Sequence, residues 1–162
     1  MKTTDSLLHD HDRFRTLLDA LDAALGLRGD TRFVVRELCF TLDHRLRDHM
    51  RRESELITTC RGPLGARELT ALAEGHGDEA HALNQAIWQL SGASSASTVW
   101  YMRGPLELAI AQFRYHMDAQ EYKLFPALAW SLNDRVRRVP DTPDALVELS
   151  PVNRVRRWEF TY

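Results

Sequence analysis

The sequence is poor in the features that mark membrane, secreted and nucleic-acid-binding proteins. Only two of its 162 residues are cysteines, and 21 Lys and Arg balance 23 Asp and Glu to a net charge of −2. Because nucleic-acid binding needs clustered cations, this balance argues against a nucleic-acid partner. No apolar run approaches the roughly 20 residues of a membrane span, so we expect no membrane partner. The N-terminus lacks the apolar region of a secretory signal, and the sequence therefore predicts a cytoplasmic protein.

The two cysteines and the missing motifs exclude further classes. Cys39 and Cys60 are 21 positions apart in one predicted helix. This spacing separates them by roughly 30 Å at about 1.5 Å per residue. They cannot form a disulfide with each other, so we interpret both as reduced, buried thiols. The sequence contains no His-Glu-x-x-His motif and no glycine-rich phosphate loop after a strand, and it therefore does not indicate a zinc protease or a nucleotide-binding protein.

Apolar residues recur at helical spacing through most of the chain. The four helices that they predict cover about residues 5–26, 30–60, 66–90 and 105–128. Clusters of glycine, proline and serine separate them, and Pro105 is expected in the first turn of the last helix. Short connections between amphipathic helices predict an all-α, up-down-up-down four-helix bundle over residues 1–132. Residues 133–162 are expected to form an irregular C-terminal tail that could pack on the bundle.

Four of the seven histidines lie on the apolar stripes of these predicted helices. There is one on each helix, namely His11, His49, His76 and His116. A single histidine on an apolar face is usually a satisfied core residue, but four in an antiparallel bundle can converge on one layer. Burying them without partners would cost about 1–3 kcal/mol each. A shared metal ion removes this cost by using their lone pairs, so the pattern predicts a metal site.

Two glutamates accompany these histidines. Glu53 follows His49 by four residues, which places both side chains on the same helix face. Glu121 follows His116 by five residues, which turns it about 140° from that face. Gln120 occupies the four-residue position, but an amide cannot bridge two metal ions as a carboxylate does. We therefore assign the second carboxylate to Glu121.

The other histidines and the large side chains have simpler interpretations. His9 and His44 fall away from the apolar stripes, so we do not assign them as ligands. The methionines and aromatic residues at helical spacing are interpreted as core packing, and one of them could close the metal site. They are Met50, Met102, Met117, Trp88, Trp100, Tyr101, Tyr115 and Trp130.

These motifs resemble the hemerythrin-like (HHE cation-binding) family over roughly residues 5–132. The resemblance is carried by His11 with Phe14, Leu18 and Leu21, by His49-Met50-Arg51-Arg52-Glu53, and by the segment from His116 to the ending Leu124-Phe125-Pro126-Ala127-Leu128. It implies a four-helix bundle with two non-haem iron ions, held by histidines and bridged by two carboxylates, with one open coordination site. Carried onto this chain, the bridging carboxylates are Glu53 and Glu121.

The third helix departs from the family pattern, in which two histidines are spaced by four. Here His76 and His81 are five apart, and Gly75 and Gly77 beside His76 could distort the turn enough to admit both. The metal ligands that we predict are therefore His11, His49, Glu53, His76, His81, His116 and Glu121.

This ligand set favours a gas-binding function. Imidazoles with bridging carboxylates suit iron or manganese. A site rich in neutral histidines favours ferrous iron, so the sequence predicts a di-iron protein that binds or senses O₂, NO or peroxide. An iron-dependent stress enzyme, active in peroxide removal or iron–sulfur repair, would use the same ligands.

Two further alternatives stay open from the sequence. Gln120 and the spacing of His76 and His81 would suit a metal-free interaction module, and a single-ion site would result if Glu121 cannot reach the centre. The tail residues Trp158 and Phe160, with nearby arginines, could form a homodimer contact.

Overall fold

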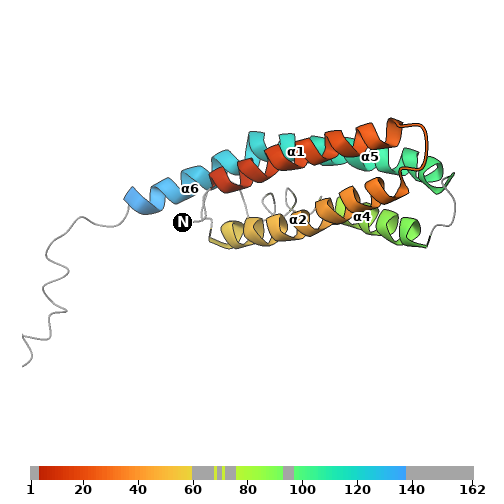
Figure 1. Ribbon diagram of the computed structural model, residues 1–162. Helices are drawn as coiled ribbons and strands as arrows, with labels where there is room; N and C mark the ends of the chain where they lie inside the picture. The colour runs from red at the N-terminus through yellow and green to blue at the C-terminus, as the bar shows by residue number, and fades with distance from the viewer. Residues whose placement is uncertain (1–3, 60–67, 69–70, 72–75, 93–96, 138–162) are drawn as a thin grey trace, which may run out of the picture. The chain divides into compact units, whose positions relative to one another are not determined.

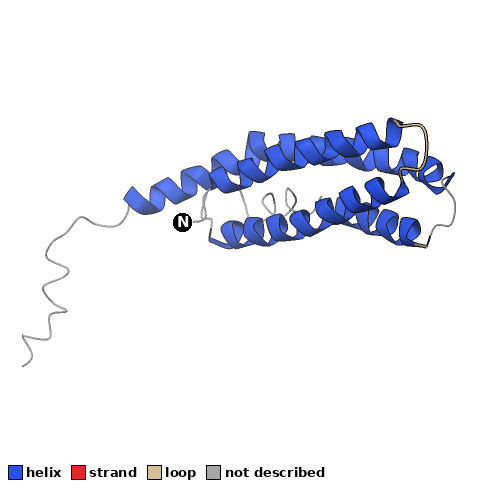
Figure 2. Cartoon of the chain, viewed as in Figure 1, coloured by secondary structure: helices blue, strands red, loops and turns tan. Residues whose placement is uncertain are grey.

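The computed structural model describes residues 4–59, 68, 71, 76–92 and 97–137, and these ranges are helical with short turns. The helices are α1 (Thr4–Gly26), α2 (Arg32–Thr59), α4 (His76–Ser91), α5 (Ser97–Ala119), a π-helical turn η1 (Gln120–Leu124) and α6 (Phe125–Arg137) (Figure 1). No strand occurs in these ranges (Figure 2). The predicted all-α class is confirmed. None of the described helices combines the length and the apolar content needed to cross a membrane.

Four helices close into a ring of neighbours. α1 packs on α2, α2 on α4, α4 on α5, and α5 returns to α1. Consecutive helices run in opposite directions along the bundle (Figure 1). Gly29, with φ of 120°, turns the chain between α1 and α2, and the Asp30 carboxylate accepts a hydrogen bond from the Arg32 backbone N–H at 3.2 Å. The structure is therefore the four-helix bundle that the sequence predicted.

The apolar stripes of the helices form two separate core clusters. The larger contains residues of all four helices, including Phe14, Leu46, Leu83 and Phe113. The smaller consists of Leu7, Leu56, Leu124, Phe125 and Leu128. Each fully buried Leu or Phe stabilises the fold by about 1.5–3 kcal/mol relative to an exposed side chain.

A layer of polar residues lies between the two clusters. His11 shows this position, because its ring contacts Phe14 of the larger cluster at 6.4 Å and Phe125 of the smaller cluster at 5.0 Å between centroids. On α2, His49 and Glu53 likewise separate Leu46 from Leu56 along the buried face. The bundle therefore encloses a polar layer with apolar packing on both sides.

Some helix boundaries differ from the expectations. α5 begins at Ser97, so Pro105 lies inside the helix instead of in its first turn. This position costs α5 one backbone hydrogen bond because proline has no N–H, and packing on α1 and α4 compensates for the loss. α6 continues to Arg137, so helix replaces irregular chain just after residue 132.

The remaining expectations concern residues that the structure leaves undescribed. Contacts group residues 1–132 and 133–162 into two units. Residues 138–162 lie outside the described ranges, and with them the packing of the tail and the predicted dimer contact. Most of residues 60–75 also lie outside, including Cys60 and the start of the predicted third helix.

The prediction that the aromatic residues pack in the core is wrong. Met102 and Met117 are buried and Met50 is partly buried, as expected. The aromatic side chains instead face outward, with 51–79% of their surface exposed, at Trp88, Trp100, Tyr101, Tyr115 and Trp130. Helical spacing places residues on a face, but it does not say how wide the buried part of that face is.

Candidate metal centre

Three histidines and one glutamate meet in the polar layer. His11 of α1, His49 of α2 and His76 of α4 have no exposed surface, and Glu53 of α2 is 1% exposed. Adjacent rings are in contact, with centroid distances of 5.0 Å between His11 and His49 and 5.4 Å between His49 and His76. Three neighbouring helices therefore bring together three of the four histidines that the sequence placed on the apolar stripes.

The inward atoms of these side chains lie at ligand spacing. Nε2 of His11 is 3.4 Å from Nε2 of His49, and Oε2 of Glu53 is 3.8 Å from Nε2 of His49 and 3.4 Å from Nε2 of His76. Donor atoms of His49, Glu53 and His76 all lie within 4.8 Å of one another. Because metal–nitrogen and metal–oxygen bonds are about 2.0–2.2 Å long, one ion can contact donors separated in this way.

Gln120 lies against Glu53 and His76 in the cluster. Its side chain is fully buried, and its amide Nε2 donates a hydrogen bond to Oε1 of Glu53 at 2.8 Å. The same amide nitrogen lies 2.9 Å from Nε2 of His76. A neutral amide thus occupies the position beside Glu53 and His76 where a second carboxylate would be needed for a bridged pair of ions.

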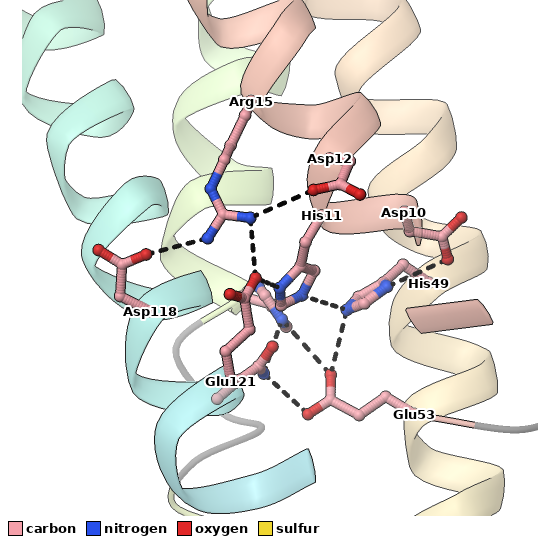
Figure 3. Close-up of polar contacts among 10 residues, drawn as sticks. Asp10, His11, Asp12, Arg15, His49, Glu53, Asp118 and Glu121 are labelled. Carbon is pink, nitrogen blue, oxygen red and sulfur yellow. Dashed lines mark hydrogen bonds and ion pairs between the residues drawn. The ribbon is translucent and has the colours of Figure 1, made fainter. Parts of the chain in front are cut away.

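Each buried histidine also faces a carboxylate on its outer side. Nδ1 of His11 lies 2.9 Å from Oε1 of Glu121, and Nδ1 of His49 lies 3.3 Å from Oδ2 of Asp10 (Figure 3). Nδ1 of His76 lies 3.5 Å from Oε2 of Glu79. Histidines that bind metals commonly present their second nitrogen to a carboxylate, which fixes the ring and raises its basicity. This arrangement orients all three Nε2 atoms toward the cluster.

Burial and the carboxylates set the protonation of the histidines. Burial, together with the neighbouring His11 and His76, lowers the pKa of His49 to about 3. Burial also lowers the pKa of His11, against the opposing effect of Glu121. Burial lowers the pKa of His76 too, but Glu53 and Glu79 overcome this effect and raise it to about 9. Two of the three rings are therefore held neutral, the form that binds a metal ion.

The outer glutamates are held in the charged form. Burial raises the pKa of Glu79, but the neighbouring rings of His116 and His76 outweigh it and lower the pKa overall. The pKa of Glu121 is lowered in the same way, against burial, by Arg15 and His11. Both carboxylates can therefore accept a hydrogen bond from a histidine ring N–H at neutral pH.

A π-helical turn positions Gln120 and Glu121. The residues on either side of η1, Ala119 and Phe125, have ordinary helical angles, so the irregularity is confined to this segment. π turns hold more residues than α turns and are frequent at functional sites. Here Gln120 is buried against Glu53, while Glu121 reaches His11 of α1 with 28% of its side chain exposed.

The structure places the other predicted ligands outside the cluster. His116 is 20% exposed, and its Nδ1 lies 3.3 Å from Oε1 of Glu79. Its ring contacts that of His76 at 5.2 Å between centroids, so it borders the site. His81 is exposed and is not brought to the cluster, because five residues of helix turn it away from the face of His76.

Sequence reasoning missed Asp10 and Glu79. Glu79 follows His76 by three residues, a spacing that places both on one face of α4, and this signal was available in the sequence. Asp10 precedes His11 directly, so its side chain points in a different direction from that of His11. Only the packing of α1 on α2 shows that Asp10 contacts His49.

Comparisons with known proteins agree with this geometry. The hemerythrin HHE cation-binding domain matches residues 2–128. No curated protein and no solved structure matches the chain. The matched range covers most of the sequence, including the described helices that supply His11, His49, Glu53 and His76. The chain therefore belongs to the hemerythrin HHE cation-binding family.

Proposed function

We propose that this chain holds non-haem iron at the buried histidine–carboxylate cluster and uses it to bind or sense O₂, NO or peroxide. The observation that carries the proposal is the approach of Nε2 of His49 and of His76 to the Glu53 carboxylate. Nε2 of His11 lies beside Nε2 of His49, so the third buried imidazole adjoins the same group. Burying such a charged and polar set is expensive unless it is compensated, and a metal ion compensates it. Mixed nitrogen and carboxylate donors suit iron.

The residues of the cluster have distinct roles in this proposal. His11 and His49 supply nitrogen donors that are neutral at pH 7. His76 supplies a third donor once it gives up its proton to bind the ion, and Glu53 supplies the negative charge. Three phenylalanine rings border the histidines, with centroid distances of 5.0 Å for His11–Phe125, 5.4 Å for Phe14–His49 and 6.1 Å for His76–Phe113. These rings exclude water from the ligands. Ferrous iron held by these residues would supply the chemistry for binding O₂ or NO.

The remaining predicted ligands would have to change their position or partners before they could bind the ion. Two iron ions bridged by Glu53 and Glu121 remain a prediction from the sequence, and this prediction requires Glu121 to leave Arg15 and His11. His116 would have to turn from Glu79, and His81 would have to cross to the other side of α4. Cytoplasmic location and homodimer formation also remain predictions.

The test is the response of loaded protein to the gases. The protein is loaded anaerobically with ferrous iron and desalted, and its visible spectrum is recorded before and after adding NO, then in a second sample with air. We expect new charge-transfer bands with each gas and their absence in the metal-free protein. Bound iron with no spectral response to either gas would contradict gas binding.

Peroxide consumption separates a carrier or sensor from an enzyme. Iron-loaded protein is mixed with excess peroxide, and the peroxide lost per iron is followed over time. We expect loss to stop after about one equivalent, since a binding site does not turn over. Continued loss over many equivalents would replace the binding function with an enzymatic one, for which the same ligands would serve.

A further inference from the structure

We propose that the centre holds a single metal ion, with Gln120 as the residue that limits it to one. This inference rests on the proposed function, because it concerns the number of ions at the same cluster. It departs from the two carboxylate-bridged ions that the sequence predicted. Three features carry it, namely the two oxygens of Glu53, the position of Glu121 and the charge of the buried layer.

The two oxygens of Glu53 have different partners. Oε2 faces the histidines, at 3.4 Å from Nε2 of His76 and 3.8 Å from Nε2 of His49. Oε1 faces away from them and accepts the hydrogen bond from Nε2 of Gln120 at 2.8 Å. A carboxylate that bridges two ions must offer one oxygen to each. Because Oε1 already accepts a hydrogen bond from Gln120, an ion there would have to share this oxygen with the amide, and Oε2 is the oxygen that Glu53 turns to the histidines.

Glu121 is engaged on the outer side of His11. Its Oε1 lies 2.9 Å from Nδ1 of His11 and 2.8 Å from Nη1 of Arg15. Nη2 of Arg15 in turn donates to Oδ1 of Asp118 at 3.0 Å, which fixes the guanidinium (Figure 3). Since the inward atom of His11 is Nε2, a carboxylate on Nδ1 orients this ring and does not share its ion. Glu121 is therefore a positioning residue.

The charge of the buried layer also fits one ion. Glu53 is the carboxylate within the ring of Nε2 atoms, while Asp10, Glu79 and Glu121 lie behind the rings on the Nδ1 side. One divalent cation beside Glu53 leaves a single net positive charge. Arg15 pairs with Glu121 and Arg52 pairs with Asp10, so the charge of Glu79 remains to offset it. Two divalent cations beside one carboxylate would repel each other in a layer with little exposure to water.

The test counts ions in variants that change only these groups. Protein is loaded anaerobically with ferrous iron, desalted and weighed by native mass spectrometry, with far-UV circular dichroism to confirm the helical fold. The variants are Gln120→Glu, which replaces the amide with a carboxylate, and Glu121→Gln. Asp118→Asn is the matched control, because Asp118 also pairs with Arg15 but is 72% exposed and contacts no histidine in the described cluster.

The single-ion centre predicts a distinct count for each protein. The wild type, Asp118→Asn and Glu121→Gln should each hold one ion per chain, with a 10- to 100-fold weaker affinity in Glu121→Gln from the loss of ring positioning. Gln120→Glu should hold two ions, because its new carboxylate frees Oε1 of Glu53 and adds a second bridge. A Gln120→Glu protein that still holds one ion would overturn the limiting role of Gln120.

Two other outcomes separate this inference from the function on which it rests. Two ions in the wild type that fall to one in Glu121→Gln would overturn the single-ion centre and make Glu121 the bridge, while the iron function stands. A folded wild type that holds no ion would overturn both. If Gln120→Glu does not fold, the wild-type and Glu121→Gln counts still decide the number of ions.

Discussion

At the scale of single residues, each buried imidazole has two different environments. Its Nε2 atom faces Glu53 or another histidine, and its Nδ1 atom faces a carboxylate from another position in the bundle. This division lets each ring present Nε2 to the centre of the folded core, and the lowered pKa values of His11 and His49 keep those two rings neutral there. The outer carboxylates hold the ring proton on Nδ1 and leave Nε2 able to bind a cation.

The role of Asp10 can be tested because Asp48 provides a matched control. Asp10→Asn should weaken ferrous binding by about 10- to 100-fold, since the neutral amide oxygen orients His49 less firmly and no longer raises the basicity of its ring. Asp48→Asn is the control, because Asp48 is 57% exposed and pairs with Arg51. Affinity is measured by competition with a ferrous chelator. Equal affinities in the two variants would show that Asp10 does not position His49.

The sequence predicted some of these residues and not others for a physical reason. His11, His49, Glu53 and His76 could be found because a polar residue on an apolar stripe must be compensated. The partners Asp10 and Glu79 lie beside the stripe, where polar residues are ordinary. Whether such a residue contacts a histidine depends on how each helix is rotated against its neighbour, which the spacing along one helix does not determine.

At the scale of the elements, the sequence predicted the helices better than their irregularities. The stripe of α1 is buried at every predicted position, and its end at Gly26 is confirmed. The π turn η1 was not predicted, and neither was the continuous course of α5 through Pro105. Both are decided by packing against other helices, which overrides the local preference of proline and of a regular helical spacing.

The core position of α1 gives a test of how the centre is supported. Phe14→Ala should lower the free energy of unfolding by about 3–5 kcal/mol, because Phe14 is 1% exposed and packs against Phe113 and His49. Phe33→Ala is the control, since Phe33 is 67% exposed and should change stability by no more than about 0.5 kcal/mol.

Urea unfolding of the metal-free proteins measures both changes. A loss below about 1 kcal/mol in Phe14→Ala would mean that the ring is not part of a tightly packed core. In the loaded protein, the same variant admits water beside His49, so we expect faster loss of iron to a chelator than in Phe33→Ala.

At the scale of the whole molecule, the polar layer divides the apolar core and makes metal-free stability depend on pH. His11 and His49 have lowered pKa values in the folded state, so stability falls as pH drops below the ordinary value of 6.5. His76 has a pKa raised to about 9, so its stabilising contribution is present below 6.5 and is lost as pH rises through about 9.

These opposing effects predict a maximum in metal-free stability near pH 6.5. The urea midpoint of the metal-free protein, measured from about pH 4 to about pH 9, should rise and then fall across this range. A midpoint that climbs steadily to the alkaline end would show that His76 is not charged in the fold. Saturating ferrous iron should raise the midpoint most at neutral pH, because the ion binds the folded bundle.

The family and the bundle could be predicted from the sequence because both depend on patterns that repeat over many residues. The apolar stripe of each helix and the spacing of His49 and Glu53 can be read from the sequence without knowing how the helices pack. The positions of Gln120 and Glu121, on which the proposed single ion rests, are set instead by a π turn of a few residues. The residue types of the cluster were therefore more accessible from the sequence than the partners of these two side chains.

The measurement that tests the account most directly is iron content after anaerobic ferrous loading and desalting. It compares the wild type with Glu53→Gln, and Glu55→Gln serves as the control because Glu55 is 44% exposed and pairs with Arg51. We predict about one iron per chain in the wild type and in Glu55→Gln, and little in Glu53→Gln, which keeps the shape but loses the buried charge. A folded wild type without iron, or a Glu53→Gln protein that retains it fully, would contradict a metal centre at this cluster.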